Sequence, residues 1–509
     1  MYEFALAILS GLLLTASFPK FGHPAFGWIA LTPLLVALAA PGGPRPLRRA
    51  FMLGLVTGAV FFTGTLYWVT EVMVTYGNIQ GWVAVLINAG LVAYQSAYPA
   101  LLAPLIRWTV RRNGALAILA APLAWVTMEL GRTHLFSGFP WVLLGYNQAT
   151  VLPIAQLASV FGVYGVSMLV ATVSAALAYL VVARTPYRWV PTATALVVVA
   201  AVAVWGSRRV AASEWTREGD PIRVGLVQAN VDQSVKWDAR RAASILEDHV
   251  RLTRQAIASG AELVIWPESS MPFFFEEDRA GSEEVRALAR DNHVPILFGS
   301  DQATWRTDNG RRVLDKLFNA AYLVRADGTT AGVYRKMQLV PFGEFVPMKR
   351  LLFFAAPLVE AVSDFSAGER IELLPVGSHR ISTAICYEIV YPYLVRDAVL
   401  EGSDLLTTIT NDAWFGATSA PYQHFTQASM RAIEDGRYLV RAANTGISGI
   451  VDPYGRVLEQ TRIYEQAVVV GTARFLRTST FYARHGDILA YASAIATLAL
   501  LITSRRRVK

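Results

Sequence analysis

The sequence predicts a polytopic α-helical membrane domain of about eight helices joined to a layered α/β domain. Three observations lead to this fold class. Hydrophobic residues make up 54% of the 509 residues and charged residues only 17%, which is too apolar for a soluble enzyme of this length. Eight apolar stretches run along the chain. The remaining polar residues gather between the seventh and eighth stretches, where strand-like and helix-like patterns alternate.

Most of the apolar stretches reach the ~20 residues that a helix needs to cross a hydrocarbon core of ~30 Å. The first is the weakest, because it is short and is followed by Pro19 and Lys20. Its N-terminal flank, Met1 to Glu3, contains no basic residue, so we expect a retained helix rather than a signal peptide. The stretches cover residues 4–18, 25–41, 51–70, 81–106, 114–130, 152–183, 189–206 and 487–503.

The net charge of +8 reflects the loops between these stretches. Twelve basic residues lie in short loops or the tail, and the other 34 face 38 acidic residues, so no basic stripe remains and we expect no nucleic-acid partner. By the positive-inside rule the basic loops and both chain ends are cytoplasmic. We therefore predict helices 1–7 in residues 1–206, an external domain in 207–484, and helix 8 with a basic cytoplasmic tail in 485–509. The twelve basic residues of the loops and the tail are Arg45, Arg48, Arg49, Arg107, Arg111, Arg112, Arg184, Arg188, Arg505, Arg506, Arg507 and Lys509.

The external segment alternates between the two kinds of secondary structure. Period-2 and β-branched runs predict strands, and an amphipathic pattern predicts helices over 239–258 and 283–290. This alternation indicates a layered α/β domain. The predicted strands cover residues 222–228, 262–266, 295–299, 320–324, 371–376, 381–385, 405–410, 438–443 and 447–452.

The chain contains one cysteine, Cys386, directly after the strand-like segment 381–385. A strand that stops at a nucleophile and continues into a helix-like segment presents that side chain above a sheet. Free cysteines are often simply buried, and a single one does not fix the redox compartment. Two other strand ends favour a catalytic interpretation, because Glu268 and Lys336 also lie where a strand gives way to a loop.

These residue types suit acyl transfer, which needs a nucleophile, a base and a donor for the oxyanion. A thiol is strongly nucleophilic. Glu268, beside apolar neighbours, would take the thiol proton, a role that typically contributes ~10² to 10⁴-fold. Lys336 would face the tetrahedral oxygen, and one such donor is often worth ~10² to 10³ in rate. We expect Glu344 to orient Lys336, and Tyr387 and Glu388 to support the cysteine side of the site.

Glu268, Lys336 and Cys386, in this order and in these local contexts, resemble the catalytic residues of the nitrilase superfamily of carbon–nitrogen hydrolases over residues 221–474. The resemblance implies an α-β-β-α sandwich, which periodicity alone does not show. A papain-like site would pair the cysteine with a histidine such as His424, but no local signature supports it. The sequence has no second cysteine and no His-Glu-x-x-His run, so we expect no metal.

A nitrilase-like domain between the seventh and eighth helices of a membrane protein resembles the apolipoprotein N-acyltransferase family. Further matching segments are 227–237, 341–347 and 410–416. The resemblance implies that Cys386 takes an acyl chain from a phospholipid, with phosphatidylethanolamine as the expected donor. The resulting thioester would then acylate the α-amino group of the diacylglyceryl cysteine at an apolipoprotein's N-terminus. It also implies that no cofactor is needed, and it places the protein in the bacterial inner membrane with its catalytic domain in the periplasm.

Several residues outside the triad are candidates for contact with a lipid substrate. Trp237, Trp414 and Phe415 are expected to bind substrate, although tryptophans also serve as packing residues. An apolar arm over 347–358 next to a basic pair suits insertion at the headgroup boundary. Glu71, Glu129 and Arg132 lie at the outer ends of predicted helices, where snorkelling is the expected explanation of a charge. The segment 137–141 is a candidate aromatic anchor or lipid entrance.

Two other functions remain open at this point. A membrane-bound amidase or nitrile hydrolase would use the same three residues with water as the acceptor, and the lifetime of the thioester would distinguish it. A transporter or receptor would use the external domain only to bind a ligand. The predicted helices contain few charges at mid-membrane depth, and all three catalytic residue types are present, which argues against transport.

Overall fold

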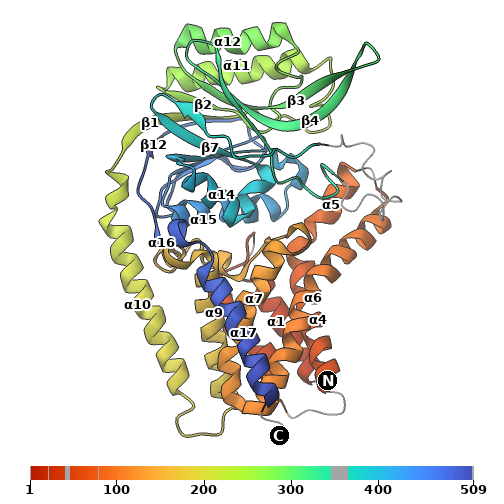
Figure 1. The fold of residues 1–509 in the computed structure, drawn as a ribbon, viewed down its shortest axis with the longest axis vertical. Helices are drawn as coiled ribbons and strands as arrows, with labels where there is room; N and C mark the ends of the chain where they lie inside the picture. Colours follow the sequence, from red (N-terminus) through yellow and green to blue (C-terminus); the bar gives the residue numbers. More distant parts are fainter. Residues whose placement is uncertain (1, 21, 41–45, 78, 346–364, 507–509) are drawn as a thin grey trace.

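The computed structural model describes residues 2–20, 22–40, 46–77, 79–345 and 365–506. The arm predicted over 347–358 lies outside the described residues. The chain forms two stacked parts, a bundle of helices and an α/β domain that sits on one end of it (Figure 1). The first helix of the chain begins, and the last helix ends, at the end of the bundle that is remote from the α/β domain. The arrangement has the two parts that the composition predicts.

The bundle contains apolar helices at all eight predicted positions. In the part of the chain that the structure describes, five helices are long and apolar enough to cross a membrane, and three more segments, 2–15, 24–39 and 488–503, are shorter apolar helices. The helices are α1 Tyr2–Thr15, α2 Gly27–Ala30, α3 Thr32–Ala39, α4 Pro46–Leu66, α5 Trp68–Thr75, α6 Gly81–Asn113, α7 Ala121–His134, α8 Leu152–Ala155, α9 Ala158–Val182, α10 Val190–Ala212 and α17 Ile488–Arg506.

The helix boundaries differ from the sequence prediction at several places, and the stretch 25–41 divides into α2 and α3. The stretch 51–70 divides into α4 and α5, and the stretch 152–183 divides into α8 and α9. Inside α9, Gly162 has a φ of 62°, which interrupts the helix and leaves the amide of Val163 free to bond outside it. The helix of the seventh apolar stretch, α10, continues to Ala212, beyond the predicted limit at residue 206. Hydropathy locates helices well but not their ends, which caps and tertiary contacts decide.

In the residues that the structure describes, the α/β domain contains two six-stranded sheets packed face to face. Their orders are β12-β1-β2-β3-β4-β5 and β11-β10-β9-β8-β7-β6. Helices α11 and α12 cover the first sheet, and α14 and α15 cover the second on the side of the bundle (Figure 1). The α-β-β-α sandwich is therefore confirmed. The elements are β1 Asp220–Gln228, α11 Ala242–Ala258, β2 Leu263–Ile265, α12 Arg279–Asn292, β3 Ile296–Asp308, β4 Arg311–Val324, β5 Thr330–Arg335, β6 Leu374–Val376, β7 His379–Ile385, α14 Pro392–Leu400, β8 Leu405–Thr410, α15 Ala420–Asp435, β9 Leu439–Ala443, β10 Gly449–Val451, β11 Val457–Gln460, β12 Ala467–Phe475 and α16 Phe481–His485.

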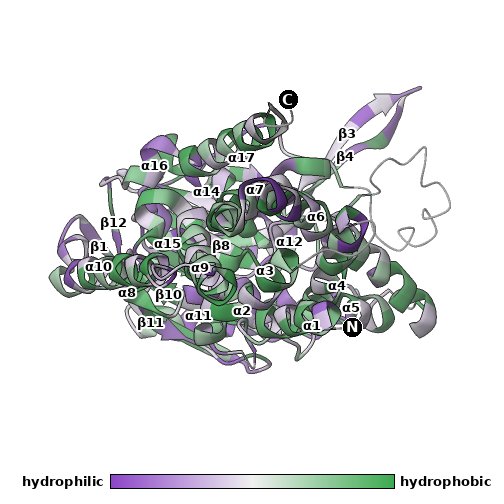
Figure 2. Ribbon diagram, turned by 90° about the horizontal axis from the view of Figure 1, so that it is seen from below, coloured by the Kyte–Doolittle hydropathy of each residue, from purple (hydrophilic) through white to green (hydrophobic). Residues whose placement is uncertain are grey.

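The strand predictions err mostly by omission. Strands β11 and β12 were not predicted, β5 was expected only as a strand end before Lys336, and β6 begins at Leu374 rather than at 371. Strand β11 is exposed at all four positions. A strand with no buried face needs no alternation of apolar and polar residues, so its sequence carries no strand signal. Strand β12 pairs with β1 across more than 200 residues of sequence, a contact that no local pattern encodes. The hairpin of β3 and β4 projects beyond the sheet (Figure 2).

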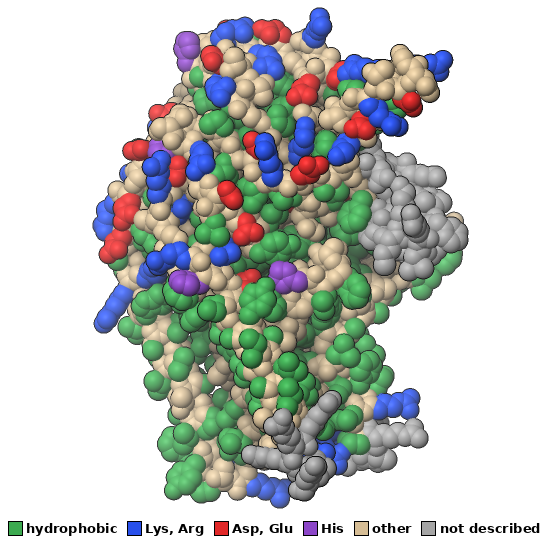
Figure 3. Space-filling model, in the orientation of Figure 1, with side chains coloured by type: hydrophobic (Ala, Val, Ile, Leu, Met, Phe, Trp, Pro, Cys, Tyr) green, Lys and Arg blue, Asp and Glu red, His purple; other side chains and the backbone are tan. Residues whose placement is uncertain are grey.

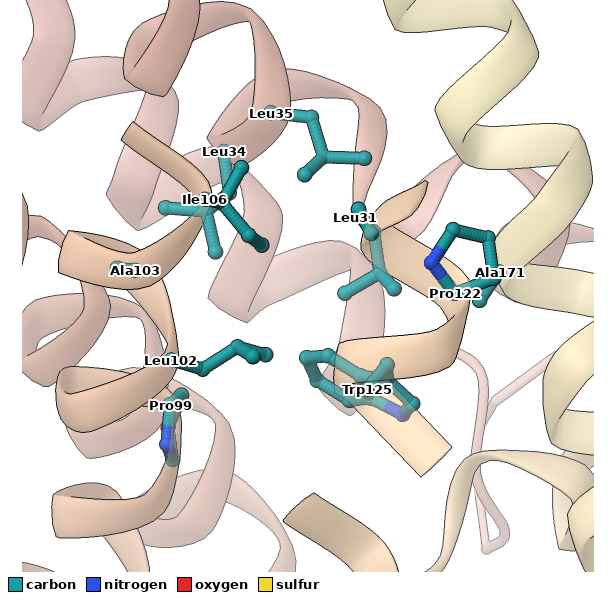
Figure 4. Close-up of a pocket in the computed structure, with 11 residues that line it drawn as sticks. Leu31, Leu34, Leu35, Pro99, Leu102, Ala103, Ile106, Pro122, Trp125 and Ala171 are labelled. Carbon is teal, nitrogen blue, oxygen red and sulfur yellow. The ribbon is translucent and has the colours of Figure 1, made fainter. Parts of the chain in front are cut away.

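The surfaces of the two parts differ as their compositions require. Charged side chains are spread over the α/β domain, whereas the visible face of the bundle is largely hydrophobic down to a few Lys and Arg side chains at its far end (Figure 3). Figure 4 shows an apolar pocket enclosed by α3, α6, α7 and α9, lined by residues such as Leu31, Leu102 and Trp125. All of its lining residues belong to the bundle, and none carries a charge.

Helix α15 joins the two parts. The indole of Trp141 donates a hydrogen bond to Gln423 over 2.7 Å, and Arg431 donates to the hydroxyl of Tyr146 over 2.6 Å. The amide of Val163, released by the break in α9, donates to Glu434 over 2.7 Å. These bonds are buried and come from the connection between α7 and α8 and from α9, so they fix the orientation of the α/β domain.

The snorkelling predicted for Glu129 and Arg132 is wrong. Both side chains are buried, at 0% and 1% exposure. Glu129 accepts hydrogen bonds from the indole of Trp125 and the amide of Leu144, and Arg132 donates to the carbonyl of Trp141 over 2.6 Å. They therefore hold the segment after α7 against the bundle. Hydropathy could not show this, because burial at a helix end depends on the loop that folds over it.

Candidate active site

Cys386 lies directly after β7, at the first residue of a short 3₁₀ helix, η7 Cys386–Val390. Its φ is 52°, in the left-handed region that non-glycine residues rarely adopt. Such a conformation costs on the order of 1–3 kcal/mol and is kept only where the surroundings impose it. The turn lies at the carboxyl end of β7, which is the second strand from the edge of the second sheet. The thiol is buried, with a residue exposure of 8%.

Glu268 and Lys336 meet in one buried cluster, although they come from different loops of the first sheet. The Lys336 ammonium lies 3.4 Å from a Glu268 oxygen and 2.8 Å from a Glu344 oxygen. The side-chain amide of Asn319 donates to both carboxylates, over 2.7 Å and 3.0 Å. The other Glu268 oxygen accepts from the amide of Asn411 over 2.9 Å. We call Glu268, Lys336, Glu344 and Asn319 the catalytic cluster.

The second sheet brings the cysteine to this cluster. The Thr410 side chain, at the end of β8, lies near the Cys386 thiol and opposes the rise of its pKa, and the backbone amide of the next residue, Asn411, donates to Glu268. Strands β7 and β8 are parallel neighbours, so their carboxyl ends lie together. The end of β8 therefore places one residue near the nucleophile and binds the carboxylate with the next.

The charges of the site fall into a defined pattern. Burial lowers the pKa of Lys336, but the Glu344 and Glu268 carboxylates outweigh it and hold that pKa above its ordinary value. Burial, reinforced by the Glu268 charge, raises the pKa of the Cys386 thiol well above its ordinary value. The thiol is therefore protonated at neutral pH and needs a base when it attacks. The cluster provides a carboxylate beside the thiol and a permanent cation beside the carboxylate.

Glu388 braces the loops that carry Lys336 and Cys386. One of its oxygens accepts from the amides of Met337 and Gln338, over 2.7 Å and 3.1 Å, and from the Tyr334 hydroxyl over 2.8 Å. The other accepts from the amide of Ile385 over 2.7 Å. Burial raises the pKa of Glu388 to about 7, although these donors oppose the shift. One carboxyl group thus ties the residues that follow Lys336 to the residue that precedes the nucleophile.

A second set of buried groups lies behind the cysteine. The His424 Nε2 atom is 3.1 Å from the carbonyl oxygen of Cys386, and Nδ1 is 3.0 Å from an Asp412 oxygen. Arg441 donates to the other Asp412 oxygen over 2.8 Å. His424 therefore contacts the backbone of the nucleophile on the side of α15, which differs from the role a papain-like site would give it. This contact helps to impose the left-handed turn.

The residues that follow the nucleophile pack against the membrane bundle. The ring of Tyr387, the next residue, lies 6.2 Å from that of Phe139, and the hydroxyl of Tyr391 is 3.1 Å from the carbonyl of Gly138. The ring of Trp141 lies 5.5 Å from that of His424. The segment 137–141, expected to be an anchor or a lipid entrance, thus packs beside the cysteine loop.

The three expected substrate-binding residues occupy different environments. Trp237 is 51% exposed, and Trp414 is 37% exposed and packs edge-on against Tyr76 at 5.3 Å. The ring of Phe415 lies 5.0 Å from that of Trp68, within the contact between bundle and α/β domain. Trp414 and Trp237 are therefore accessible to a ligand, whereas Phe415 packs into the junction.

Sequence reasoning missed Lys236 and Asn319. The Lys236 ammonium is buried and donates to the backbone carbonyl of Glu268 over 3.1 Å. Burial lowers its pKa to about 8, against the charges of Glu268 and Asp301. Lys236 lies in the matching segment 227–237, which was a signal for it, whereas Asn319 lies inside β4 and carries no local signature. Within the described ranges, no group of three or more His, Cys, Asp and Glu side chains has the arrangement of a metal site.

Comparison with known proteins gives matches over both parts. Residues 10–176 match the family model described as apolipoprotein N-acyltransferase N-terminal domain, and residues 223–478 match carbon-nitrogen hydrolase. The apolipoprotein N-acyltransferase of Geobacter metallireducens is 39% identical over 99% of this chain and 96% of its own length. That of Methylococcus capsulatus is 34% identical over 100% of this chain and 97% of its own. An amidase from Nesterenkonia sp., with 21% identity and a TM-score of 0.38, covers 51% of this chain and 93% of its own.

Proposed function

We propose, because the chain belongs to the apolipoprotein N-acyltransferase family, that it transfers an acyl chain from a phospholipid to the N-terminal diacylglyceryl cysteine of apolipoproteins. It is an acyltransferase of a bacterial membrane, with a nitrilase-like domain on a helical membrane part. The residues that perform the reaction are Cys386, Glu268 and Lys336, supported by Glu344 and Glu388.

One observation carries this proposal. The cysteine loop packs against the membrane bundle, through Tyr387 on Phe139 and through Tyr391 on Gly138. A hydrolase of soluble amides has no need to pack its cysteine loop against a membrane part. An enzyme whose substrates are both anchored in lipid needs that position, because their reactive groups stay close to the headgroup boundary.

In the first step the Cys386 sulfur attacks the ester carbonyl of the phospholipid. The thiol proton passes to the Glu268 carboxylate, and the Lys336 ammonium stabilises the oxyanion of the tetrahedral intermediate. The carbon–oxygen bond then breaks, and the leaving alkoxide takes the proton from Glu268. The products are a thioester on Cys386 and a lysophospholipid. Glu344 keeps Lys336 charged and oriented, so the cation is in place before the charge develops.

In the second step the neutral α-amino group of the diacylglyceryl cysteine attacks the thioester. Glu268 removes a proton from the nitrogen, and Lys336 again stabilises the oxyanion. The carbon–sulfur bond breaks, and the thiolate recovers the proton from Glu268. The step is downhill because an amide is more stable than a thioester. The ester of the donor already activates the acyl chain, so neither a nucleotide nor a metal is required.

The finer assignments rest on charge and placement. We propose phosphatidylethanolamine as the donor and the inner membrane as the location, with the catalytic domain in the periplasm. The basic loops support this orientation, because they belong to the side of the bundle remote from the α/β domain. Trp237 and Trp414 are proposed to contact the lipid, since both are exposed aromatic side chains in loops that also carry Lys236 and Asn411.

The test is a two-stage reaction with the purified full-length protein. Incubation with phospholipid alone should release one equivalent of lysophospholipid and then stop. Addition of a diacylglyceryl-cysteinyl peptide should restart release and give the N-acylated peptide. Continuous release of free fatty acid without the peptide would show a hydrolase instead and contradict the proposal.

A further inference from the structure

A pocket of about 300 Å³ lies where the bundle meets the α/β domain. The helical part contributes Glu71 and Thr75 from α5 together with Tyr76, and the α/β domain contributes Trp414 and Tyr464 from two loops. Neither part forms the pocket alone. Its walls are largely aromatic, and among the described residues that line it only Glu71 carries a full charge.

The Glu71 carboxylate is available to a ligand. No hydrogen bond or ion pair joins it to another side chain among the described residues, and the side chain is exposed. It lies against the backbone of Gly416, since a Cβ built on that glycine would be 3.1 Å from its Oε1 atom. Gly416 has a φ of 62°, so the position both requires a glycine and leaves room for the carboxylate.

The aromatic walls are held in place and are neutral. Tyr76 donates from its hydroxyl to the carbonyl of Ala413 over 2.8 Å, and its ring meets that of Trp414 edge-on. Burial, with the nearby charges of Asp232 and Glu71, raises the pKa of Tyr76. Burial and its neighbours raise the pKa of Tyr464 to about 12. Fixed aromatic faces beside one carboxylate form the arrangement that binds ammonium groups by combined cation–π and charge attraction.

We propose that this pocket binds the ammonium group of a lipid substrate, with Glu71 as its counter-ion and Trp414 and Tyr76 as its aromatic walls. The proposal rests on the proposed acyltransferase function and specifies how the substrate is held. Two substrates of that function carry an amine, the donor with an aminoethyl headgroup and the diacylglyceryl-cysteinyl acceptor. The same chemistry would recognise either.

The position of the pocket favours the headgroup of the donor. Trp414 is four residues beyond Thr410, whose side chain lies near the Cys386 thiol, so the backbone positions of Thr410 and Trp414 are at most about 14 Å apart. The reacting α-amine must reach the thioester itself and must be neutral to attack. An ammonium that is held to one side by a carboxylate remains charged, which suits a group that anchors the substrate without reacting.

The experiment measures the two steps separately in Glu71→Gln, Glu71→Asp and wild-type protein. Acylation of the enzyme is followed by intact mass with phosphatidylethanolamine and with phosphatidylglycerol of identical acyl chains, because the second has no ammonium. Transfer is followed by adding the peptide to enzyme that is already acylated. Glu247→Gln, which removes an exposed carboxylate from α11, is the matched control.

We expect Glu71→Gln to lower the acylation efficiency with phosphatidylethanolamine about tenfold and to leave phosphatidylglycerol unchanged, with partial recovery in Glu71→Asp. A loss confined to the transfer step would assign the same pocket to the acceptor's amine. Equal losses with both donors, or no loss in either step, would overturn the proposal. If the wild type forms no acyl-enzyme from either lipid, the proposed function fails rather than the pocket.

Discussion

Two of the buried clusters of charged side chains in the α/β domain serve different purposes. The catalytic cluster surrounds Lys336 at the ends of strands, and a thiol in a left-handed turn lies beside it. The other, which we call the docking cluster, consists of Arg431 and Glu434 on α15 with Tyr146 and Val163 of the bundle. In both, an Arg or Lys is paired with a glutamate at about 3 Å and is fully buried.

The difference shows that burial and charge do not by themselves identify an active site. The docking cluster contains an ion pair and two hydrogen bonds but no nucleophile that could lose a proton, so it can only hold the two parts together. In the catalytic cluster, a carboxylate adjoins a protonated thiol that can lose its proton. The strand-to-loop position and the backbone strain of Cys386 are the features that separate the two.

The largest expected effect comes from Glu268→Gln, which removes the base and keeps the shape. The amide can still accept from Asn411 but cannot take the thiol proton, so we expect the acylation rate to fall by about 10³-fold. The rate is measured by intact mass after rapid mixing with phospholipid. A rate within a factor of a few of the wild type would show that another group is the base.

Lys336→Met should affect both rate and stability. It removes the oxyanion partner, which we expect to lower the acylation rate by about 10²-fold. It also leaves two buried carboxylates without their cation, which should reduce the free energy of unfolding by about 3–5 kcal/mol. Thermal unfolding in detergent measures the second effect.

The double variant Lys336→Met with Glu344→Gln separates these effects. Removing one of the uncompensated carboxylates should restore much of the stability, because fewer buried charges lack a partner. The acylation rate should stay low. Recovery of the rate together with the stability would mean that Lys336 is a structural residue, like Arg431.

Glu434→Gln tests the structural role of the docking cluster. It breaks a buried ion pair with Arg431, so we expect the free energy of unfolding to fall by about 3 kcal/mol. The acylation rate of the folded protein should change by less than about threefold, because no bond to the catalytic cluster is lost. A fall of tenfold or more at unchanged substrate affinity would place α15 in the chemistry.

The smallest effect concerns the pH dependence of acylation. Burial lowers the pKa of Lys236 to about 8, so this group is charged at pH 7 and neutral at pH 9. The charged form of Lys236 stabilises the negative charge that forms on the sulfur. The acylation rate of the wild type should therefore fall severalfold as the pH rises through 8. Lys236→Met should be slower at pH 7 and lack this decline. An unchanged decline in the variant would assign it to another group.

The sequence predicted the parts of the site that have local signatures. Glu268, Lys336 and Cys386 each follow or adjoin a strand-like run, and the apolar stretches locate the helices. Asn319 and the docking cluster were not predicted, because a polar residue inside a strand or an amphipathic helix has no pattern that reveals its partner. Glu129 and Arg132 were misassigned for the same reason, since their burial depends on a loop folded over a helix end.

The most direct test of the account is to locate the acyl group on the protein. Wild-type protein is incubated with phospholipid, digested, and analysed by mass spectrometry alongside Cys386→Ala and Glu434→Gln. We predict an acyl mass on the peptide that contains Cys386 in the wild type and in Glu434→Gln, removed by hydroxylamine, and none in Cys386→Ala. An acyl group on another residue, or one that persists in Cys386→Ala, would contradict the central claim that the strained cysteine beside the catalytic cluster is the nucleophile.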